Sequence, residues 1–362
     1  MNSKSILVVG LSAVFTLSAI GYSATSAASN EGHPTLVVTM TNDPAGNSIN
    51  VYDASSLALL QTLSTNGAGG ASGNARGIRQ SNGKLLAVVN YGSNSVAIFK
   101  RDGDTLKLDR MVTTTSAPAS VDFGSGHMYV AGATTADSFV VHGNSVGSRD
   151  GTANLRLAGG GAPPGGSTAQ VGAVDDDTLL VTLKTDPTPG TVDVVPLYKG
   201  IITGTPPGAV AAPSNTLTPF GFAVYPDGTA VITLAHSNND GLFRDGAFVS
   251  TIAAGQTAPC WITRFDKYLF TANTGSHTIS RLIGTGNNIF VDSAVAAPIP
   301  TGGAPSDIDA AGDALAVIDH AIESHISVFD VNEFGELSAV RSATVGPSAN
   351  GVALMPPADD DE

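Results

Sequence analysis

The chain has 362 residues, a formal net charge of −14 and one cysteine, Cys260. A single cysteine excludes an intramolecular disulfide, so the fold must be stabilised by a hydrophobic core, which a chain of this length can bury. The negative charge argues against binding to nucleic acid or to anionic membranes. The sequence contains 42 glycines and 20 prolines but only 13% charged residues. This composition favours short strands joined by turns over long amphipathic helices.

The first residues of the chain predict a secretory signal peptide. A short polar start carries Lys4, residues 6–20 are almost all apolar or small, and a run of small residues follows. This order is typical of an exported protein, and we expect cleavage near Ala27 or Ala28. We therefore predict a signal peptide over residues 1–28 and a secreted or periplasmic location. A membrane anchor is the weaker interpretation, because a spanning helix needs roughly 20 apolar residues.

A short pattern recurs along the rest of the chain. It consists of a small residue or proline, any residue, an anchor, and usually an apolar residue that begins a strand. Successive anchors are spaced as expected for four-stranded propeller blades of roughly 40–50 residues. The seven predicted anchors are Gly77, Ser120, Val171, Gly221, Trp261, Asp307 and Gly351.

The two ends of the repeat region predict how the ring closes. Residues 35–39 and 48–52 resemble the second and third strands of a blade whose first strand is missing, and residues 350–355 form an unpaired first strand. Pairing these segments would leave no open edge in the ring. We therefore predict an all-β, seven-bladed β-propeller of four-stranded antiparallel blades over residues 34–357. The acidic residues 358–362 are expected to be a disordered tail.

Three segments carry a resemblance to a known family. They are Ala272-Asn273-Thr274-Gly275-Ser276-His277-Thr278-Ile279, Ala258-Pro259-Cys260-Trp261-Ile262 and Leu217-Thr218-Pro219-Phe220-Gly221-Phe222. Together they resemble the repeats of the lactonase-like, YVTN-type seven-bladed propellers, which include 6-phosphogluconolactonase-like and carboxymuconate-lactonizing-enzyme-like proteins. The resemblance implies the propeller fold and an activity that hydrolyses or forms a lactone. It does not assign the family's catalytic His, Arg and Glu to positions in this chain.

Propeller geometry predicts which polar residues meet. The first strand of each blade begins at the same face on which the loop between the second and third strands opens, so these residues should surround the mouth of the central channel. Polar groups that converge on a concave mouth are the first candidates for a binding site. Arg76 could bind a carboxylate, and histidines beside Glu323 could transfer a proton. The candidate catalytic residues are His277, His325 and Glu323, and the candidate substrate-binding residues are Arg76, Gln170, His236, His320 and Asn350.

Two functions fit a propeller with these polar residues about equally. The first is an exported enzyme that hydrolyses or forms a small anionic lactone at the channel mouth. The second is a non-catalytic propeller that binds a ligand or a protein partner through the same face, and in either case we expect a monomer. We predict no cofactor and no metal site, since no His/Cys cluster has zinc spacing. The sequence leaves open a metal held by loop side chains from different blades.

Overall fold

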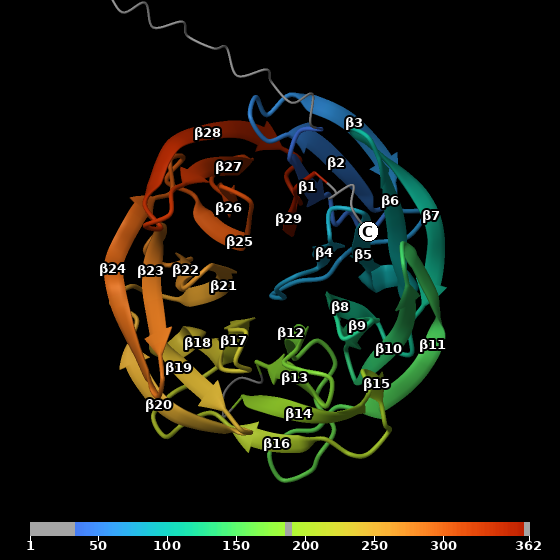
Figure 1. Ribbon diagram of the computed structural model, residues 1–362, viewed down its shortest axis with the longest axis vertical. Coiled ribbons are helices and arrows are strands. Elements are labelled where there is room, and N and C mark those ends of the chain that lie inside the picture. The colour runs from blue at the N-terminus through green and yellow to red at the C-terminus, as the bar shows by residue number, and fades with distance from the viewer. Residues whose placement is uncertain (1–32, 185–189, 358–362) are drawn as a thin grey trace, which may run out of the picture. The chain divides into compact units, whose positions relative to one another are not determined.

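Short apolar segments that alternate in side-chain direction form seven antiparallel sheets, which follow one another around a ring (Figure 1). The computed structural model describes residues 33–184 and 190–357. The predicted signal peptide, with its cleavage site, and the predicted acidic tail lie outside the described residues. The seven-bladed, all-β prediction is confirmed, and the only helices in the described part of the chain are two 3-10 turns, η1 (Tyr91–Ser93) and η2 (Ala235–Ser237). None of the helices in this part is long and apolar enough to cross a membrane.

The blades follow the chain in order, and each begins with its innermost strand except the first. Blades 1 to 3 consist of β29 (Val352–Met355), β1 (Leu36–Met40), β2 (Ser48–Asp53) and β3 (Leu59–Ser64); β4 (Ile78–Ser81), β5 (Leu85–Asn90), β6 (Ser95–Asp102) and β7 (Thr105–Thr113); and β8 (Pro118–Gly124), β9 (His127–Gly132), β10 (Thr135–His142) and β11 (Ser145–Asn154).

Blades 4 to 7 repeat this order, with one extra strand in blade 4. They consist of β12 (Thr168–Ala173), β13 (Thr178–Leu183), β14 (Thr191–Tyr198), β15 (Ile201–Ile202) and β16 (Gly208–Ala211); β17 (Pro219–Val224), β18 (Ala230–Leu234), β19 (Asn239–Arg244) and β20 (Ala247–Ala253); β21 (Pro259–Phe265), β22 (Tyr268–Asn273), β23 (Thr278–Thr285) and β24 (Asn288–Pro298); and β25 (Ala304–Ala311), β26 (Ala314–His320), β27 (Ser324–Val331) and β28 (Leu337–Val345).

The ring closes as predicted. The C-terminal strand β29 pairs with β1 in an antiparallel ladder, with Val38 opposite Ala353. Figure 1 shows this meeting of the two ends, where the red β29 lies beside the blue β1. Because β29 supplies the innermost strand of blade 1, the N-terminal and C-terminal segments share one sheet, which removes the open edge that each would otherwise present.

Side chains at the anchor positions link each blade to the next. Ser120 Oγ accepts the backbone N–H of Val171 at 3.1 Å, and Asp307 Oδ2 accepts that of Val352 at 3.1 Å. In blade 4 the same bond is made by Gln170, whose Oε1 accepts the N–H of Phe222 at 3.0 Å. The prediction of Val171 as the blade 4 anchor was therefore wrong by one residue, because the β-bulge in β12 skips Ala169.

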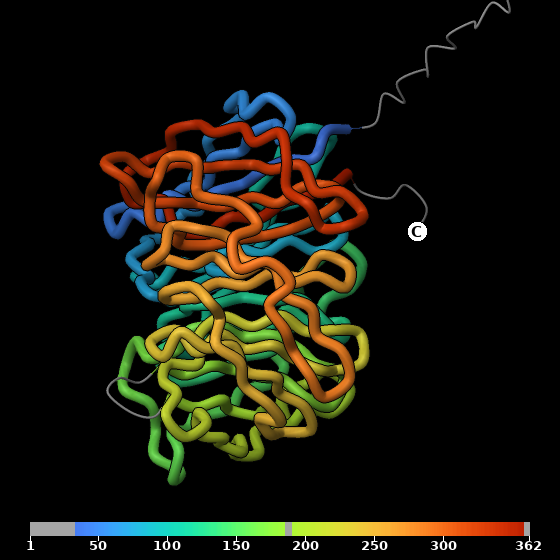
Figure 2. Tube along the Cα trace, turned by 90° about the vertical axis from the view of Figure 1, so that its left-hand side faces the viewer, coloured from blue at the N-terminus to red at the C-terminus, as the bar shows by residue number. Residues whose placement is uncertain are grey.

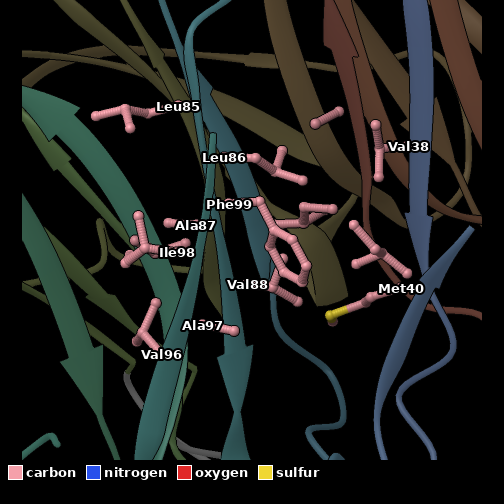
Figure 3. Packing of buried hydrophobic residues seen from close by; sticks show 14 of the residues in the cluster. Val38, Met40, Leu85, Leu86, Ala87, Val88, Val96, Ala97, Ile98 and Phe99 are labelled. Carbon is pink, nitrogen blue, oxygen red and sulfur yellow. The ribbon is translucent and has the colours of Figure 1, made fainter. Parts of the chain in front are cut away.

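The core lies between neighbouring blades. Figure 3 shows alternate residues of β5 pointing to opposite sides of their sheet, with Leu86 and Val88 directed toward Val38 and Met40 of blade 1. All four side chains are fully buried, and burying each contributes about 1.5–3 kcal/mol. Seen edge-on in Figure 2, the hairpin turns line two opposite faces of the ring. We call the face with the β5–β6, β22–β23 and β26–β27 loops the mouth face.

Candidate functional site

The mouth of the central channel is filled by the protein's own chain. The connector between β3 and β4 reaches toward the middle of the ring (Figure 1), where Asn74 contacts three other blades. Its side-chain nitrogen donates to the Ala119 carbonyl at 2.6 Å, its side-chain oxygen accepts from Asn350 at 3.2 Å, and its backbone carbonyl accepts the Trp261 indole N–H at 3.0 Å. Ala75 N donates to the Ala169 carbonyl at 2.9 Å. The concave channel mouth expected from the sequence is therefore covered.

A half-buried lysine also holds this connector. Lys184 Nζ donates to the Ser72 carbonyl at 3.3 Å and also to the Gly73 carbonyl. Burial lowers the pKa of the Lys184 ammonium to about 8, so most of it is protonated at neutral pH and can donate to both carbonyls.

Arg76 lies directly after the connector, with a left-handed backbone of φ 55°. Its Nη1 is 3.5 Å from Asp122 Oδ2, and its side chain is 13% exposed. Burial lowers the pKa of Arg76, and the neighbouring guanidinium of Arg79 lowers it further. Arg76 is therefore committed to a charged network inside the ring and is not free at the mouth.

That network joins four blades. Arg79 Nε is 3.2 Å from Asp122 Oδ1 in blade 3, and its Nη1 is 2.7 Å from Asp309 Oδ1 in blade 7. The other oxygen of Asp309 accepts the backbone N–H of Leu354 in the closing strand at 3.0 Å. Burial raises the pKa of nearby Asp307 to about 7. The sequence analysis did not assign a site role to Arg79, Asp122 or Asp309, since their convergence depends on strands far apart in the chain.

Two further candidate residues, Gln170 and Asn350, make structural hydrogen bonds. Gln170 is 1% exposed, and its amide both accepts from Phe222 N and donates to the Phe222 carbonyl at 2.7 Å. Asn350 donates from its backbone N to the Met40 carbonyl and from its side chain to Asn74. These bonds hold blades 4 and 5 together and anchor the connector, respectively, so neither residue presents a free amide nitrogen to a ligand.

Three candidate histidines interact electrostatically with one carboxylate, Asp319, that was not predicted from the sequence. His325 Nδ1 lies 3.7 Å from Asp319 Oδ1, and both His320 and His277 also interact electrostatically with Asp319. His277 comes from the β22–β23 loop, and the other two histidines from the β26–β27 hairpin. We call His277, His320, His325 and Asp319 the histidine cluster.

Asp319 is held rigidly from the connector between blades 6 and 7. Its Oδ1 accepts the Thr301 hydroxyl at 2.5 Å, and a Cβ at Gly303 would lie 2.1 Å from the same oxygen. The residue is fully buried, and Oδ2 has no hydrogen-bond partner among the described residues. Burial raises the pKa of Asp319, while the Thr301 bond and the three histidines oppose that rise.

His320 Nδ1 is 2.7 Å from Ser324 Oγ, which is also 3.2 Å from the Pro347 carbonyl oxygen. When the Ser324 hydroxyl donates to Pro347, Nδ1 carries the ring proton and Nε2 is an acceptor. Burial lowers the pKa of His320, so its ring is neutral at pH 7.

The remaining candidates stand apart from these contacts. His236 lies in η2 of blade 5, and its Nδ1 is 2.9 Å from the Thr218 hydroxyl. Glu323 is exposed at the tip of the β26–β27 hairpin, next in the chain to Ile322, whose side chain is also fully exposed. Among the residues that the structure describes, no group of three or more His, Cys, Asp or Glu side chains is arranged to hold a metal ion.

A sequence signal for Asp319 did exist. Asp319 follows the apolar run Ala314-Leu315-Ala316-Val317-Ile318 and directly precedes His320. A carboxylate at the end of a buried strand is unusual and therefore indicates a candidate functional residue. Its contact with His277 could not be seen in the sequence, because the two residues belong to different blades.

Comparisons with known proteins find similar folds among solved structures only. No protein-family model matches the chain, and no curated protein matches it. A solved structure of the periplasmic gluconolactonase from Pseudomonas aeruginosa has a TM-score of 0.63 at 15% identity, covering 89% of this chain and 99% of that one. A candidate 6-phosphogluconolactonase from Bacteroides uniformis has a TM-score of 0.63 at 14% identity, covering 88% and 99%.

A third similar structure is a lyase. The virginiamycin B lyase from Staphylococcus aureus, solved with quinupristin as a catalytically inactive histidine-to-alanine variant, has a TM-score of 0.52 at 15% identity, covering 80% of this chain and 92% of that one. Identities this low establish the fold and not the activity. The chain shares the propeller fold of the lactonase-like proteins that the sequence pattern resembles.

Proposed function

We propose that this chain is an exported propeller that hydrolyses a lactone at the histidine cluster. The observation that carries the proposal is the electrostatic interaction of the buried Asp319 carboxylate with His277, His320 and His325, of which His325 has its Nδ1 3.7 Å from Asp319 Oδ1. The similar structures named as lactonases support it, as does a lyase of this fold that is inactive in a histidine-to-alanine variant. Export rests on the predicted signal peptide and on the periplasmic location of one of these lactonases.

In this proposal His320 is the general base, in the tautomer whose Nδ1 donates to Ser324. Its unprotonated Nε2 would take a proton from water, while the water oxygen forms a bond to the lactone carbonyl carbon. The ring C–O bond then breaks, and the same proton passes to the departing ring oxygen, giving a hydroxy acid. Asp319 would stabilise the imidazolium that forms between these steps, and His325 would orient the carbonyl group. The 3.7 Å separation of His325 Nδ1 from Asp319 Oδ1 is longer than a hydrogen bond, and catalytic contacts of this length often shorten when substrate binds.

The anionic lactone expected from the sequence depended on Arg76. That guanidinium is paired with Asp122, and residues 273–278, 299–306 and 319–325, which the structure describes in full, contain no lysine or arginine. A carboxylate on the substrate would therefore find no cation at the histidine cluster. We accordingly extend the proposal to lactones without a negative charge.

The proposal is tested by lactone hydrolysis, followed as acid release, with His320→Ala and with His142→Ala as a control. His142 is exposed at a turn on the opposite face. We expect His320→Ala to lower kcat by about 10²–10⁴-fold and His142→Ala to change nothing. Because the His320 pKa is lowered, wild-type activity should be retained below pH 6.5. Equal activity of the two variants would refute the proposed site.

A non-catalytic function has one observation in its favour. Ile322, at the tip of the β26–β27 hairpin, is the most exposed large apolar side chain among the described residues. An exposed apolar residue beside Glu323 on the mouth face suits contact with a protein partner. In that case Ile322→Ser would abolish partner binding, and no lactone would be hydrolysed.

A further inference from the structure

A polar groove lies on the mouth face. It has a volume of about 460 Å³ and lies between the η2 turn of blade 5 and the β22–β23 loop of blade 6. Ser237 lines one side and Ser276 lines the other, and Ser276 directly precedes His277 of the histidine cluster in the same loop. The groove and the cluster therefore share the β22–β23 loop, and the groove is in the size range of small-molecule sites.

The side chains in the groove are amides and hydroxyls whose inner atoms are already bonded. Asn238 Oδ1 accepts Ala258 N at 2.8 Å, Asn239 Nδ2 donates to the Ile252 carbonyl at 3.0 Å, and Gln256 Oε1 accepts the Thr278 hydroxyl at 3.1 Å. These bonds fix the orientation of each amide. The other ends of these three amides, Asn238 Nδ2, Asn239 Oδ1 and Gln256 Nε2, belong to residues that line the groove.

The groove carries no charge. Its lining residues include no Asp, Glu, Lys or Arg. Fixed amide donors and acceptors without charge are complementary to hydroxyl or amide groups on a neutral molecule. A charged group placed there would lose hydration without gaining a partner.

We propose that this groove binds an uncharged, hydroxyl- or amide-bearing substituent of the substrate, beyond the lactone ring. The inference rests on the proposed function, because it takes the ring to lie at the histidine cluster. The substrate is then an extended neutral molecule, larger than a simple lactone. Its ring reacts beside His277, and its substituent lies against Asn238 and Gln256.

The repeat provides a matched control for a variant in the groove. Asn238 caps η2 with φ 56°, and Asn94 caps η1 of blade 2 with φ 50°. Each backbone carbonyl accepts the first N–H after the outer strand of its blade, from Ala254 and Thr114, respectively. Asn238→Asp and Asn94→Asp are therefore the same change in the same backbone setting, and only the first replaces a ligand-facing amide nitrogen.

The test measures kcat and KM for three uncharged lactones. δ-Valerolactone has only the ring, lactobiono-δ-lactone adds a hydroxyl-bearing substituent, and N-butanoyl-homoserine lactone adds an amide. We expect wild type to prefer one of the two extended lactones through a lower KM, which also identifies the source of the polar groups. Asn238→Asp should raise that KM about 2- to 10-fold with kcat unchanged. The same variant should leave δ-valerolactone unaffected, and Asn94→Asp should behave as wild type.

Binding without reaction separates the inference from the proposed function. Lactitol and the γ-lactam of N-butanoyl-homoserine lactone are neutral and are not hydrolysed, so their affinities can be measured by calorimetry. If no lactone is hydrolysed but Asn238→Asp weakens lactitol or lactam binding, the proposed function fails and the groove stands. If lactones are hydrolysed with equal KM for ring and extended substrates, or Asn94→Asp matches Asn238→Asp, the groove inference is wrong.

Discussion

Blades 2 and 7 build the same local structure around different side chains. In blade 2, the Thr65 hydroxyl donates to Asn90 Oδ1 at 2.8 Å, and a Cβ at Gly67 would lie 2.4 Å from the Asn90 side chain. In blade 7, the Thr301 hydroxyl donates to Asp319 Oδ1 at 2.5 Å, and a Cβ at Gly303 would lie 2.1 Å from the same oxygen. Both residues are fully buried at the end of the second strand of their blade.

Asn90 and Asp319 differ in charge and in the side chains around them. Asn90 accepts a second bond from Asn47 Nδ2 at 3.0 Å, so it is part of a neutral network. Asp319 instead interacts electrostatically with His325, His320 and His277. The repeat therefore supplies a rigid buried position in both blades, and an acid among histidines turns one copy into a candidate site.

The largest effect should come from exchanging these two side chains. Asp319→Asn keeps the shape and the Thr301 bond but removes the charge that would stabilise an imidazolium. We expect kcat for lactone hydrolysis to fall by about 10²–10⁴-fold, with thermal stability unchanged or increased, since a buried carboxylate is lost. The measurement is steady-state kinetics alongside thermal unfolding.

The reciprocal variant is the control for this exchange. Asn90→Asp places a carboxylate in the blade 2 copy, where no histidine faces it, so the protein should lose stability and keep its activity. A loss of activity in Asn90→Asp equal to that in Asp319→Asn would mean that both act through the fold.

The seven repeats and their closure were predictable because strand alternation and turn residues are local signals. That His320 and His325 belong to one hairpin was also predictable from the sequence. Their partner Asp319 and the network of Arg79 with Asp309 were missed, because each contact joins residues that a blade boundary separates in the sequence. The covered channel mouth was missed for a related reason: a glycine-rich connector predicts a turn, but not where Asn74 will dock.

Replacing the glycine of either connector by alanine should have the same effect on stability but a different effect on activity. Gly303→Ala and Gly67→Ala each introduce a methyl group closer than contact distance to the buried Asp or Asn. We expect each to destabilise the protein by about 1–3 kcal/mol. Only Gly303→Ala should lower kcat, by roughly 10²-fold, because it displaces Asp319 from the histidines. Chemical denaturation and kinetics on both variants test this, and an inactive Gly67→Ala would contradict it.

Blade 5 differs from the other six blades at one core position, on the third strand. Asp240 is fully buried, and neither carboxylate oxygen has a hydrogen-bond partner among the described residues. The other six blades place a fully buried aliphatic residue at this position; these residues are Ile49, Val96, Ala136, Val192, Ile279 and Ile326. Burial raises the pKa of Asp240 to about 7.

Asp240→Val should therefore stabilise the protein by about 1–3 kcal/mol at pH 7.5. The sign of the pH dependence follows from the raised pKa: the folded protein holds a proton that the unfolded chain releases near pH 4, so wild type loses stability as pH rises from about 4 to 7. The variant lacks this loss, and its advantage should shrink toward pH 4. Urea unfolding at both pH values measures it, and a variant no more stable than wild type at pH 7.5 would show that Asp240 has a partner.

The smallest effect concerns the two connectors themselves. Both hold a buried side chain through a threonine, but only the connector of blade 2 continues to the channel mouth, where Asn74 meets Trp261. The chain has one tryptophan, which is 9% exposed, so its fluorescence reports this contact alone. Asn74→Ala removes the side-chain bonds to Ala119 and Asn350 and should cost about 1 kcal/mol of stability. Water then reaches the indole, and the fluorescence emission of Trp261 should shift to longer wavelength.

Ser72→Ala, in the same connector, is the control. It removes an exposed hydroxyl and should leave the spectrum unchanged. If Asn74→Ala also left it unchanged, the connector would be held by its backbone bonds alone, and the mouth would be closed independently of Asn74.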